Sequence, residues 1–246
     1  MALYSDAAMV LYYDIAGDNA DHDDWHTYEH MHERLSIPGF LRATRWVAKS
    51  GAPKYLVIYE QADVGVGMSD AYLERLNNPT PWTSSMMARF RNMIRGFCAV
   101  TASAGYGLGN AAVSMRFLPD KGREADARDQ LKKHILPAMA SWRGMASVHV
   151  FEPAVQPPMT REQSIRGKDK DMTWVLLATG YDADALAKAA ERHLEPGVLA
   201  RYGVSAPADK GTYALHYTVT AQEVTRTAAN PALDPEARQQ AGPRRR

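Results

Sequence analysis

Residues 25–40 read Trp-His-Thr-Tyr-Glu-His-Met-His-Glu-Arg-Leu-Ser-Ile-Pro-Gly-Phe, and in this stretch a helix gives way to a strand. The acidic residues 18–24 before it supply N-cap candidates and first-turn carboxylates for a helix over about 23–36. Pro38 and Gly39 end that helix, and an apolar run typical of a strand follows. This helix–strand boundary is the reference point from which the neighbouring elements are assigned.

Titratable side chains form one stripe along this helix. His26, Glu29, His30 and Glu33 fall at i, i+3, i+4 and i+7, which the helical period places on one face. The stripe beside it is apolar, so we expect the titratable row to be at least partly desolvated. That neighbouring stripe consists of Tyr28, Met31 and Leu35.

The elements around this helix follow in a regular order. A strand over 8–15 precedes it, and two strands joined by a short hairpin follow it. A second helix, broken by a proline-rich loop, and a fourth strand complete a βαββαβ unit, the ferredoxin-like arrangement. The expected ranges are 40–48 and 54–61 for the hairpin, 69–76 and 83–92 for the helix, and 93–102 for the last strand.

The same order of elements recurs in the second half of the chain. Residues 7–11 resemble 111–115, and residues 39–43 resemble 144–148 at almost the same offset. The later matches are displaced because the second half carries an insertion at 155–171, which we interpret as either a lid or a surface loop. We therefore divide the chain into a first unit (1–104), a second unit (105–222) and a disordered tail (223–246).

Two such units predict an α+β fold in which their sheets close into a pseudo-symmetric α/β barrel. Each four-stranded sheet has helices on one face and must bury the other. If the two bare faces meet, they enclose a cavity between them. We expect the titratable row of the first helix to face that cavity.

Composition excludes several classes of protein. The formal charge of +1 argues against a nucleic-acid partner, and no window has the roughly 18 apolar residues of a membrane span. A single cysteine, Cys98, excludes an internal disulfide framework, and residues 1–6 do not resemble a signal peptide. We expect a cytoplasmic protein.

The histidines and glutamates of the first helix are a suitable set for general acid/base catalysis. A carboxylate beside an imidazole fixes its tautomer and stabilises the imidazolium that forms. The corresponding second-half helix, about 125–141, has only His134, so the first helix carries residues that the fold does not require. The alternative is an ordinary solvated face. His30 is the expected principal acid/base, with Glu29 or Glu33 as its partner and His26 as a helper.

The same residues also match a zinc-binding pattern. Residues 26–30 satisfy H-x-x-E-H, in which two histidines bind zinc and the glutamate activates water. However, zinc proteases of this kind have longer helical domains, whereas here a strand follows Pro38. We therefore expect no metal, with zinc kept as an alternative.

Four segments together resemble the EthD-like branch of the dimeric α/β-barrel superfamily: residues 29–34, 38–42, 55–60 and 78–83. The resemblance implies the ferredoxin-like barrel and a small-molecule pocket between sheet and helices. It also implies that His30 is the motif histidine, flanked by Glu29 and Glu33. His32 departs from the pattern, where proline is more usual. Members of the superfamily include cofactor-free monooxygenases, decarboxylases, isomerases and cyclases, and in other branches haem enzymes.

Aromatic and cationic side chains are candidates for substrate binding. Trp46, Tyr59 and Trp82, together with Phe90, would form a wall for a flat ligand, or else belong to the core. Arg45 would pair with a substrate carboxylate if it points inward. Tyr28, beside the titratable row, completes the set.

The sequence thus predicts a cofactor-independent acid/base enzyme, a lyase or isomerase acting on a small aromatic or cyclic acid or ketone. The alternatives are a haem- or oxygen-dependent oxidoreductase in the same fold and a non-catalytic barrel that binds a small ligand. We expect a small-molecule substrate and neither nucleic-acid nor membrane partners. Because single-unit members of the superfamily dimerise, a homodimer is a further alternative.

Overall fold

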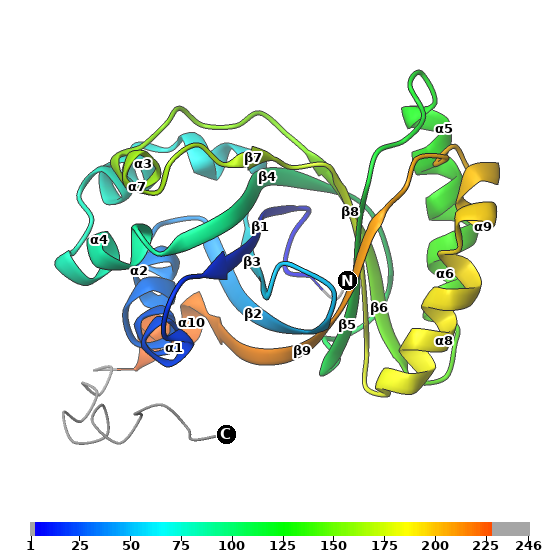
Figure 1. Cartoon of the computed structure of the whole chain (residues 1–246), viewed down its shortest axis with the longest axis horizontal. Helices are drawn as coiled ribbons and strands as arrows, with labels where there is room; N and C mark the ends of the chain where they lie inside the picture. Colours follow the sequence, from blue (N-terminus) through cyan, green and yellow to red (C-terminus); the bar gives the residue numbers. More distant parts are fainter. Residues whose placement is uncertain (1–2, 228–246) are drawn as a thin grey trace.

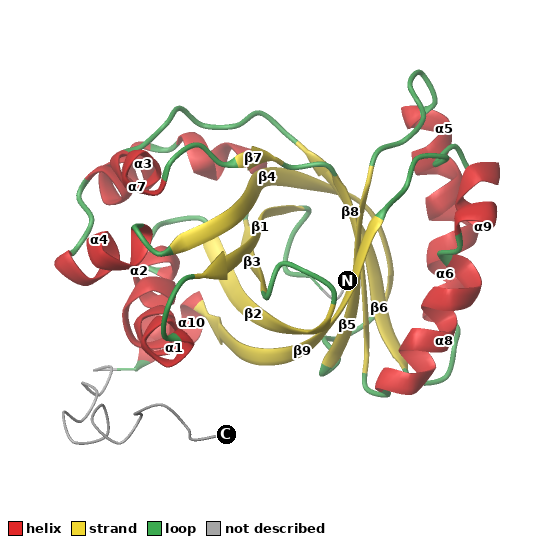
Figure 2. Ribbon diagram, viewed as in Figure 1, coloured by secondary structure: helices red, strands yellow, loops and turns green. Residues whose placement is uncertain are grey.

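The structure is a computed structural model that describes residues 3–227. Eight of its strands form a closed antiparallel barrel with helices outside it (Figure 1; Figure 2). In the first half the elements are β1 (Ala7–Ile15), α1 (Asn19–Trp25), η1 (His26–His30), α2 (Met31–Leu35), β2 (Phe40–Ser50), β3 (Tyr55–Gln61), η2 (Val64–Met68), α3 (Asp70–Asn77), α4 (Pro81–Met87) and β4 (Phe90–Gly105). In the second half they are β5 (Ala111–Phe117), α5 (Glu124–Gln130), η3 (Leu131–Ile135), α6 (Leu136–Ala140), β6 (Met145–Pro153), α7 (Arg161–Arg166), β7 (Lys170–Asp171), β8 (Trp174–Gly180), α8 (Ala183–His193), α9 (Pro196–Arg201), β9 (Asp209–Thr220) and α10 (Ala221–Arg226).

The two halves have the same strand order. The first sheet runs β4-β1-β3-β2 and the second runs β9-β5-β8-β6, which is the ferredoxin-like order in both. β2 pairs with β9, and β4 pairs with β6, so the two sheets join at both edges. Closure leaves the barrel without a free edge. The predicted α+β barrel is confirmed.

The side chains of each strand alternate between the barrel interior and the helices. On β1, Tyr12 points inside and Tyr13 points to the helices, and on β3 the same holds for Ile58 and Tyr59. The interior is a packed core that includes Trp46 and Phe151. The expected cavity between the two sheets is therefore replaced by side chains, because the bare faces meet closely enough to fill the barrel.

The first helix begins earlier than expected. Asp18 caps it by accepting a hydrogen bond from the backbone N–H of Ala20 at 2.9 Å, and three consecutive segments, α1, η1 and α2, continue to Leu35. At the other end of the chain, α10 covers part of the segment expected to be a disordered tail. The rest of that segment, 228–246, lies outside the described residues.

The insertion at 155–171 reaches over the first half of the molecule. It contains α7, which packs against α3 and α4 although its neighbours in sequence belong to the second half (Figure 1). The short strand β7 adds to β4 in parallel. The insertion was expected to be either a lid or a surface loop. In the structure it packs as a cover over elements of the first half.

Among residues 3–227, no helix is both long enough and apolar enough to cross a membrane.

Candidate active site

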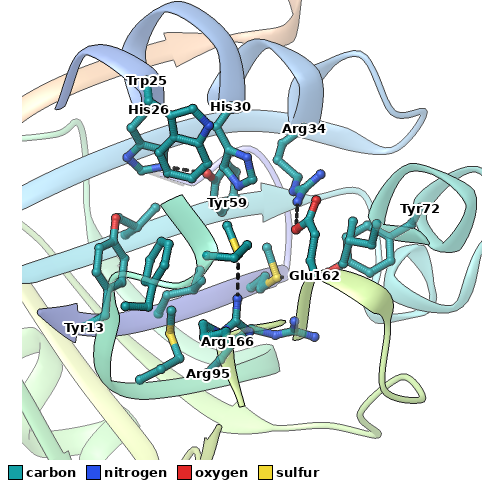
Figure 3. A pocket seen from close by; sticks show the side chains of 17 residues that line it. Tyr13, Trp25, His26, His30, Arg34, Tyr59, Tyr72, Arg95, Glu162 and Arg166 are labelled. Atoms are coloured by element: carbon teal, nitrogen blue, oxygen red, sulfur yellow. Dashed lines mark hydrogen bonds and ion pairs between the residues drawn. The ribbon is translucent and has the colours of Figure 1, made fainter. Parts of the chain in front are cut away.

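A small cavity lies between the helix-facing side of the first sheet and the helices that cover it (Figure 3). It has about 30 Å³ of free space, enough for a water molecule or two. Its walls combine an apolar, largely aromatic lining with a row of polar groups. The lining residues are Met9, Leu11, Tyr13, Trp25, His26, His30, Arg34, Val57, Tyr59, Tyr72, Leu76, Met87, Phe90, Met93, Arg95, Glu162 and Arg166.

A π turn in the first helix determines which side chains reach the cavity. In η1 the backbone N–H of Met31 bonds to the carbonyl of His26, an i→i−5 bond that widens the turn. Positions four apart then lie nearly above one another. The buried polar stripe is consequently His22, His26, His30 and Arg34, rather than the predicted row with the two glutamates.

Burial lowers the pKa of each imidazole in this stripe below its usual value. His26 Nε2 lies 2.8 Å from the Tyr59 hydroxyl, and His22 Nε2 lies 3.1 Å from the Tyr13 hydroxyl. Burial, reinforced by nearby guanidinium charges, holds the pKa of His26 and that of His30 well below the usual value. An imidazole with a lowered pKa is unprotonated at neutral pH and able to accept a proton.

Two of these rings have unsatisfied nitrogen atoms. The Nδ1 atoms of His26 and His30 are buried, and neither has a hydrogen-bond partner among the described residues. The His30 ring lies against the indole of Trp25, with centroids 4.2 Å apart. Unpaired buried polar atoms cost stability, so their presence at a cavity is a feature to be explained.

The two predicted carboxylate partners are engaged elsewhere. The Glu29 carboxylate accepts hydrogen bonds from the hydroxyls of Thr80, at 2.6 Å, and Thr83, at 3.1 Å, at the start of α4. Glu33 lies 3.4 Å from Arg75, and burial raises the pKa of its carboxyl group. Neither is a lining residue of the cavity, because the π turn rotates both away from it.

The structure places some of the predicted substrate-binding residues at the cavity and others away from it. Tyr59 lines the cavity, as does Phe90. Trp46 lies in the barrel interior instead, because it has the opposite strand phase. Tyr28 is exposed, and Trp82 is partly buried at the outside of the helix-side core.

Arg45 is buried beside the site but is held by the protein itself. Its guanidinium donates to His216 Nδ1 at 3.0 Å and to the Thr27 hydroxyl at 2.9 Å. It also donates to the backbone carbonyl of Asp23. Its charge contributes to the lowered pKa of His26, so it acts on the site through an imidazole rather than by direct contact. His32 lies outside the cavity, in a surface groove beside α10.

Several residues of the site were not identified from the sequence. Arg34 and His22 extend the histidine stripe at the same four-residue spacing, which was the available signal. Glu162 and Arg166 come from α7 in the insertion, and no local pattern connects them with the first helix. Tyr13, Tyr72 and Arg95 are further polar lining residues that the sequence did not indicate.

The second half provides an internal comparison. Its equivalent helix also contains a π turn, η3, whose first and last residues are Leu131 and Ile135 where η1 has His26 and His30. Both are buried in the second core. The fold therefore accepts apolar side chains at these positions, and the histidines are not needed to build it.

The stripe does not form a zinc site. The ring centroids of His22 and His26 are 5.3 Å apart and those of His26 and His30 are 5.7 Å apart, and two of the rings bind tyrosine hydroxyls. Within residues 3–227, no three His, Cys, Asp or Glu side chains are grouped as metal ligands. With about 30 Å³ of free space the cavity is too small for haem in this conformation, so haem, like any other ligand larger than water, would need α7 to move.

A scan against models of known protein families found no match, and a search of curated proteins found no significant one. Solved structures do match. An anthrone oxidase-like protein aligns over 91% of this chain and 96% of its own, with a TM-score of 0.62 and 11% identity. A "Putative monooxygenase" from Fusobacterium nucleatum aligns over 89% and 96%, with a TM-score of 0.58 and 10% identity.

A third structure, a "Putative Chlorite dismutase", covers 89% of this chain and 96% of its own, with a TM-score of 0.51 and 12% identity. At these identities the likeness concerns the fold alone. Together with the strand order, it shows that the chain has the dimeric α/β-barrel, ferredoxin-like fold.

Proposed function

We propose that the chain is an enzyme that removes a proton from a small aromatic or cyclic acid or ketone, with the neutral His30 imidazole as the proton acceptor. The supporting observation is the contrast between the two halves. Where the second half has Leu131 and Ile135, the first half buries two imidazoles with unpaired nitrogen atoms at a cavity. A position that costs stability without serving the fold is typical of a catalytic site.

The surroundings suit this reaction. Once α7 moves aside, the apolar and aromatic walls can receive a flat ring, while Arg34 supplies a positive charge for the enolate or carbanion that forms. His26, held by the Tyr59 hydroxyl, is placed to return or relay the proton. We retain Glu29 and Glu33 as outer residues that position the helix. No cofactor is required for the proton transfer itself.

An oxygen-dependent oxidoreductase is the second candidate, favoured by the anthrone oxidase-like and monooxygenase structures. The first step is shared, because a carbanion or enolate is the species that reacts with dioxygen. Addition of O₂ followed by loss of water converts a CH₂ group into C=O. The two candidates thus differ in the fate of the carbanion and not in the role of His30.

The test compares His30→Gln with His134→Gln, a control on the exposed face of the equivalent helix. Anthrone, 2-tetralone and 1-indanone serve as probes, and deuterium uptake from D₂O and oxygen consumption are measured separately. We expect parent and control to accelerate exchange, and His30→Gln to lose about 100-fold or more, the usual contribution of a general base. Exchange without oxygen uptake supports a lyase or isomerase, and uptake supports the oxidase. Equal rates in parent and His30→Gln would contradict the proposal.

Three further features remain proposals: the EthD-like assignment, the cytoplasmic location and the homodimer. The EthD-like assignment rests on the four segments quoted above, and the cytoplasmic location rests on the composition. A homodimer is compatible with the fold, and sedimentation of the full chain would test it.

A further inference from the structure

Arg34 and Glu162 form a buried ion pair inside the cavity. Arg34 Nη2 lies 2.5 Å from Glu162 Oε2, and the two side chains are only 3% and 4% exposed. The second terminal nitrogen of the guanidinium, Nη1, is buried and has no hydrogen-bond partner among the described residues. A guanidinium normally binds a carboxylate through two nitrogens, so this pair leaves part of its binding capacity unused.

The cavity carries an excess of positive charge. Three guanidinium groups line it, those of Arg34, Arg95 and Arg166, whereas Glu162 is the one carboxylate among the described lining residues. Arg166 is also bound by Asp169 at 2.7 and 2.9 Å, but that carboxylate lies outside the lining. The electrostatic potential of this water-poor site therefore favours binding of an anionic ligand.

Glu162 belongs to the insertion, whereas Arg34 belongs to the first helix. α7 has six residues; it packs against α3 and α4, and it is joined to the first half by the Arg34–Glu162 pair and by a hydrogen bond from the Arg161 N–H to Asn77 Oδ1 at 3.0 Å. A stretch without regular structure precedes it, and Gly167 at its end has a φ of +94°, with no neighbouring atom within 4 Å of the position that a Cβ would take. Such a segment can be displaced without breaking the barrel.

A route from outside leads along the same segment. Arg95 lines the cavity and also a surface groove of about 190 Å³ whose other walls belong to the insertion. Displacing α7 would join the groove to the cavity and enlarge the space. The unused nitrogen of Arg34, the cationic lining and the movable carboxylate thus occur at one place.

We infer that the site binds an aromatic carboxylate, and that the substrate carboxylate takes the place of Glu162 on Arg34 as α7 moves away. Glu162 then acts as an internal stand-in that keeps Arg34 paired when no ligand is present. This inference rests on the proposed function for the location of the site and adds the class of ligand.

The experiment measures binding of 1-naphthoate and of the uncharged 1-naphthamide to the full chain by calorimetry. We expect the parent to prefer naphthoate about tenfold or more, as a charge-assisted bond predicts. Glu162→Gln removes the competing carboxylate and should bind naphthoate more tightly by a similar factor. The double variant Arg34→Gln/Glu162→Gln keeps a neutral pair and should lose the preference for the acid.

A matched control and a second readout guard against simple loss of structure. Glu152→Gln removes a carboxylate that is paired with Arg128 in the second half, and it should leave both affinities unchanged. Glu162→Gln leaves Arg34 buried without its partner, so its melting temperature should fall and should be restored by naphthoate but not by naphthamide.

Equal affinity of the parent for the two probes would overturn the inference, as would naphthoate binding that Glu162→Gln weakens. The outcome is separable from that of the proposed function. His30→Gln should still bind naphthoate, so selective binding without any turnover would refute the catalytic role alone. Turnover of the ketone probes with no preference for naphthoate would refute the ligand class alone.

Discussion

His30 lies at the cavity with a buried Nδ1 atom that makes no hydrogen bond to the described residues. Burial and the nearby positive charge of Arg34 lower the pKa of its ring, and no carboxylate within residues 3–227 is bonded to it. The expected imidazole–carboxylate pair is thus replaced by an imidazole–guanidinium arrangement. The Arg34 cation has two opposite effects: it lowers the proton affinity of His30 while keeping the ring unprotonated, and it stabilises the anion produced from the substrate.

Glu29→Gln tests whether the Glu29 carboxylate stabilises the contact with α4 or takes part in proton transfer with the imidazoles. Because Thr80 and Thr83 donate to this carboxylate, we expect the free energy of unfolding to fall by about 1 kcal/mol in urea denaturation. The loss of turnover should be smaller than in His30→Gln. Glu33→Gln, whose carboxylate has only a long contact with Arg75, is the matched control. A loss of activity equal to that of His30→Gln would place Glu29 in the proton relay after all.

At the scale of elements, the π turn η1 decides the composition of the site. The sequence indicated a helix ending near Pro38, and this was correct, but a regular helical period was assumed. The additional residue in the turn brings Arg34 into line with the histidines and takes Glu29 and Glu33 out of it. Nothing in a local pattern of polar and apolar residues distinguishes an α turn from a π turn, since a π turn also forms in η3, whose sequence Leu-Lys-Lys-His-Ile differs from that of η1.

Exchanging residues between the equivalent helices gives a reciprocal prediction. His30→Ile introduces the side chain found at Ile135 and removes an unpaired buried nitrogen, so we expect stability to rise by about 1 kcal/mol while turnover disappears. Ile135→His buries an unpaired imidazole in an apolar core and should cost about 2 kcal/mol or more. Urea denaturation measures both. Destabilisation by His30→Ile would show that His30 serves the fold.

At the scale of the molecule, the fold was predictable because both halves repeat one order of elements and each sheet must bury its bare face. The position of the cavity was not, because it depends on how closely the two sheets approach. Tyr12, Trp46 and Phe151 fill the barrel, so the free space is left on the helix side of the first sheet. The contribution of α7 was also beyond prediction, since Glu162 and Arg34 are 128 residues apart in sequence and come together only through the tertiary fold.

Whole-molecule stability is linked to the same histidines. His26 and His30 are neutral when folded but titrate near pH 6.5 when unfolded, so the unfolded state binds more protons below that pH. Acidification below about 6.5 therefore favours unfolding, by up to about 1.4 kcal/mol per pH unit for each such group. Above that range both states hold the rings neutral, and this proton-linked destabilisation is absent.

The protonation of His30 in the folded protein tests the account most directly. Nuclear magnetic resonance of the chain with ¹³C-labelled histidine, assigned with His30→Gln, follows the ring between pH 8 and pH 5.5. We predict that the His30 signal keeps the chemical shift of a neutral imidazole throughout this range and moves when 1-naphthoate is added. A midpoint near 6.5, as for a free imidazole in water, together with no response to naphthoate, would contradict the central claim that this ring is a dry proton acceptor at a binding site.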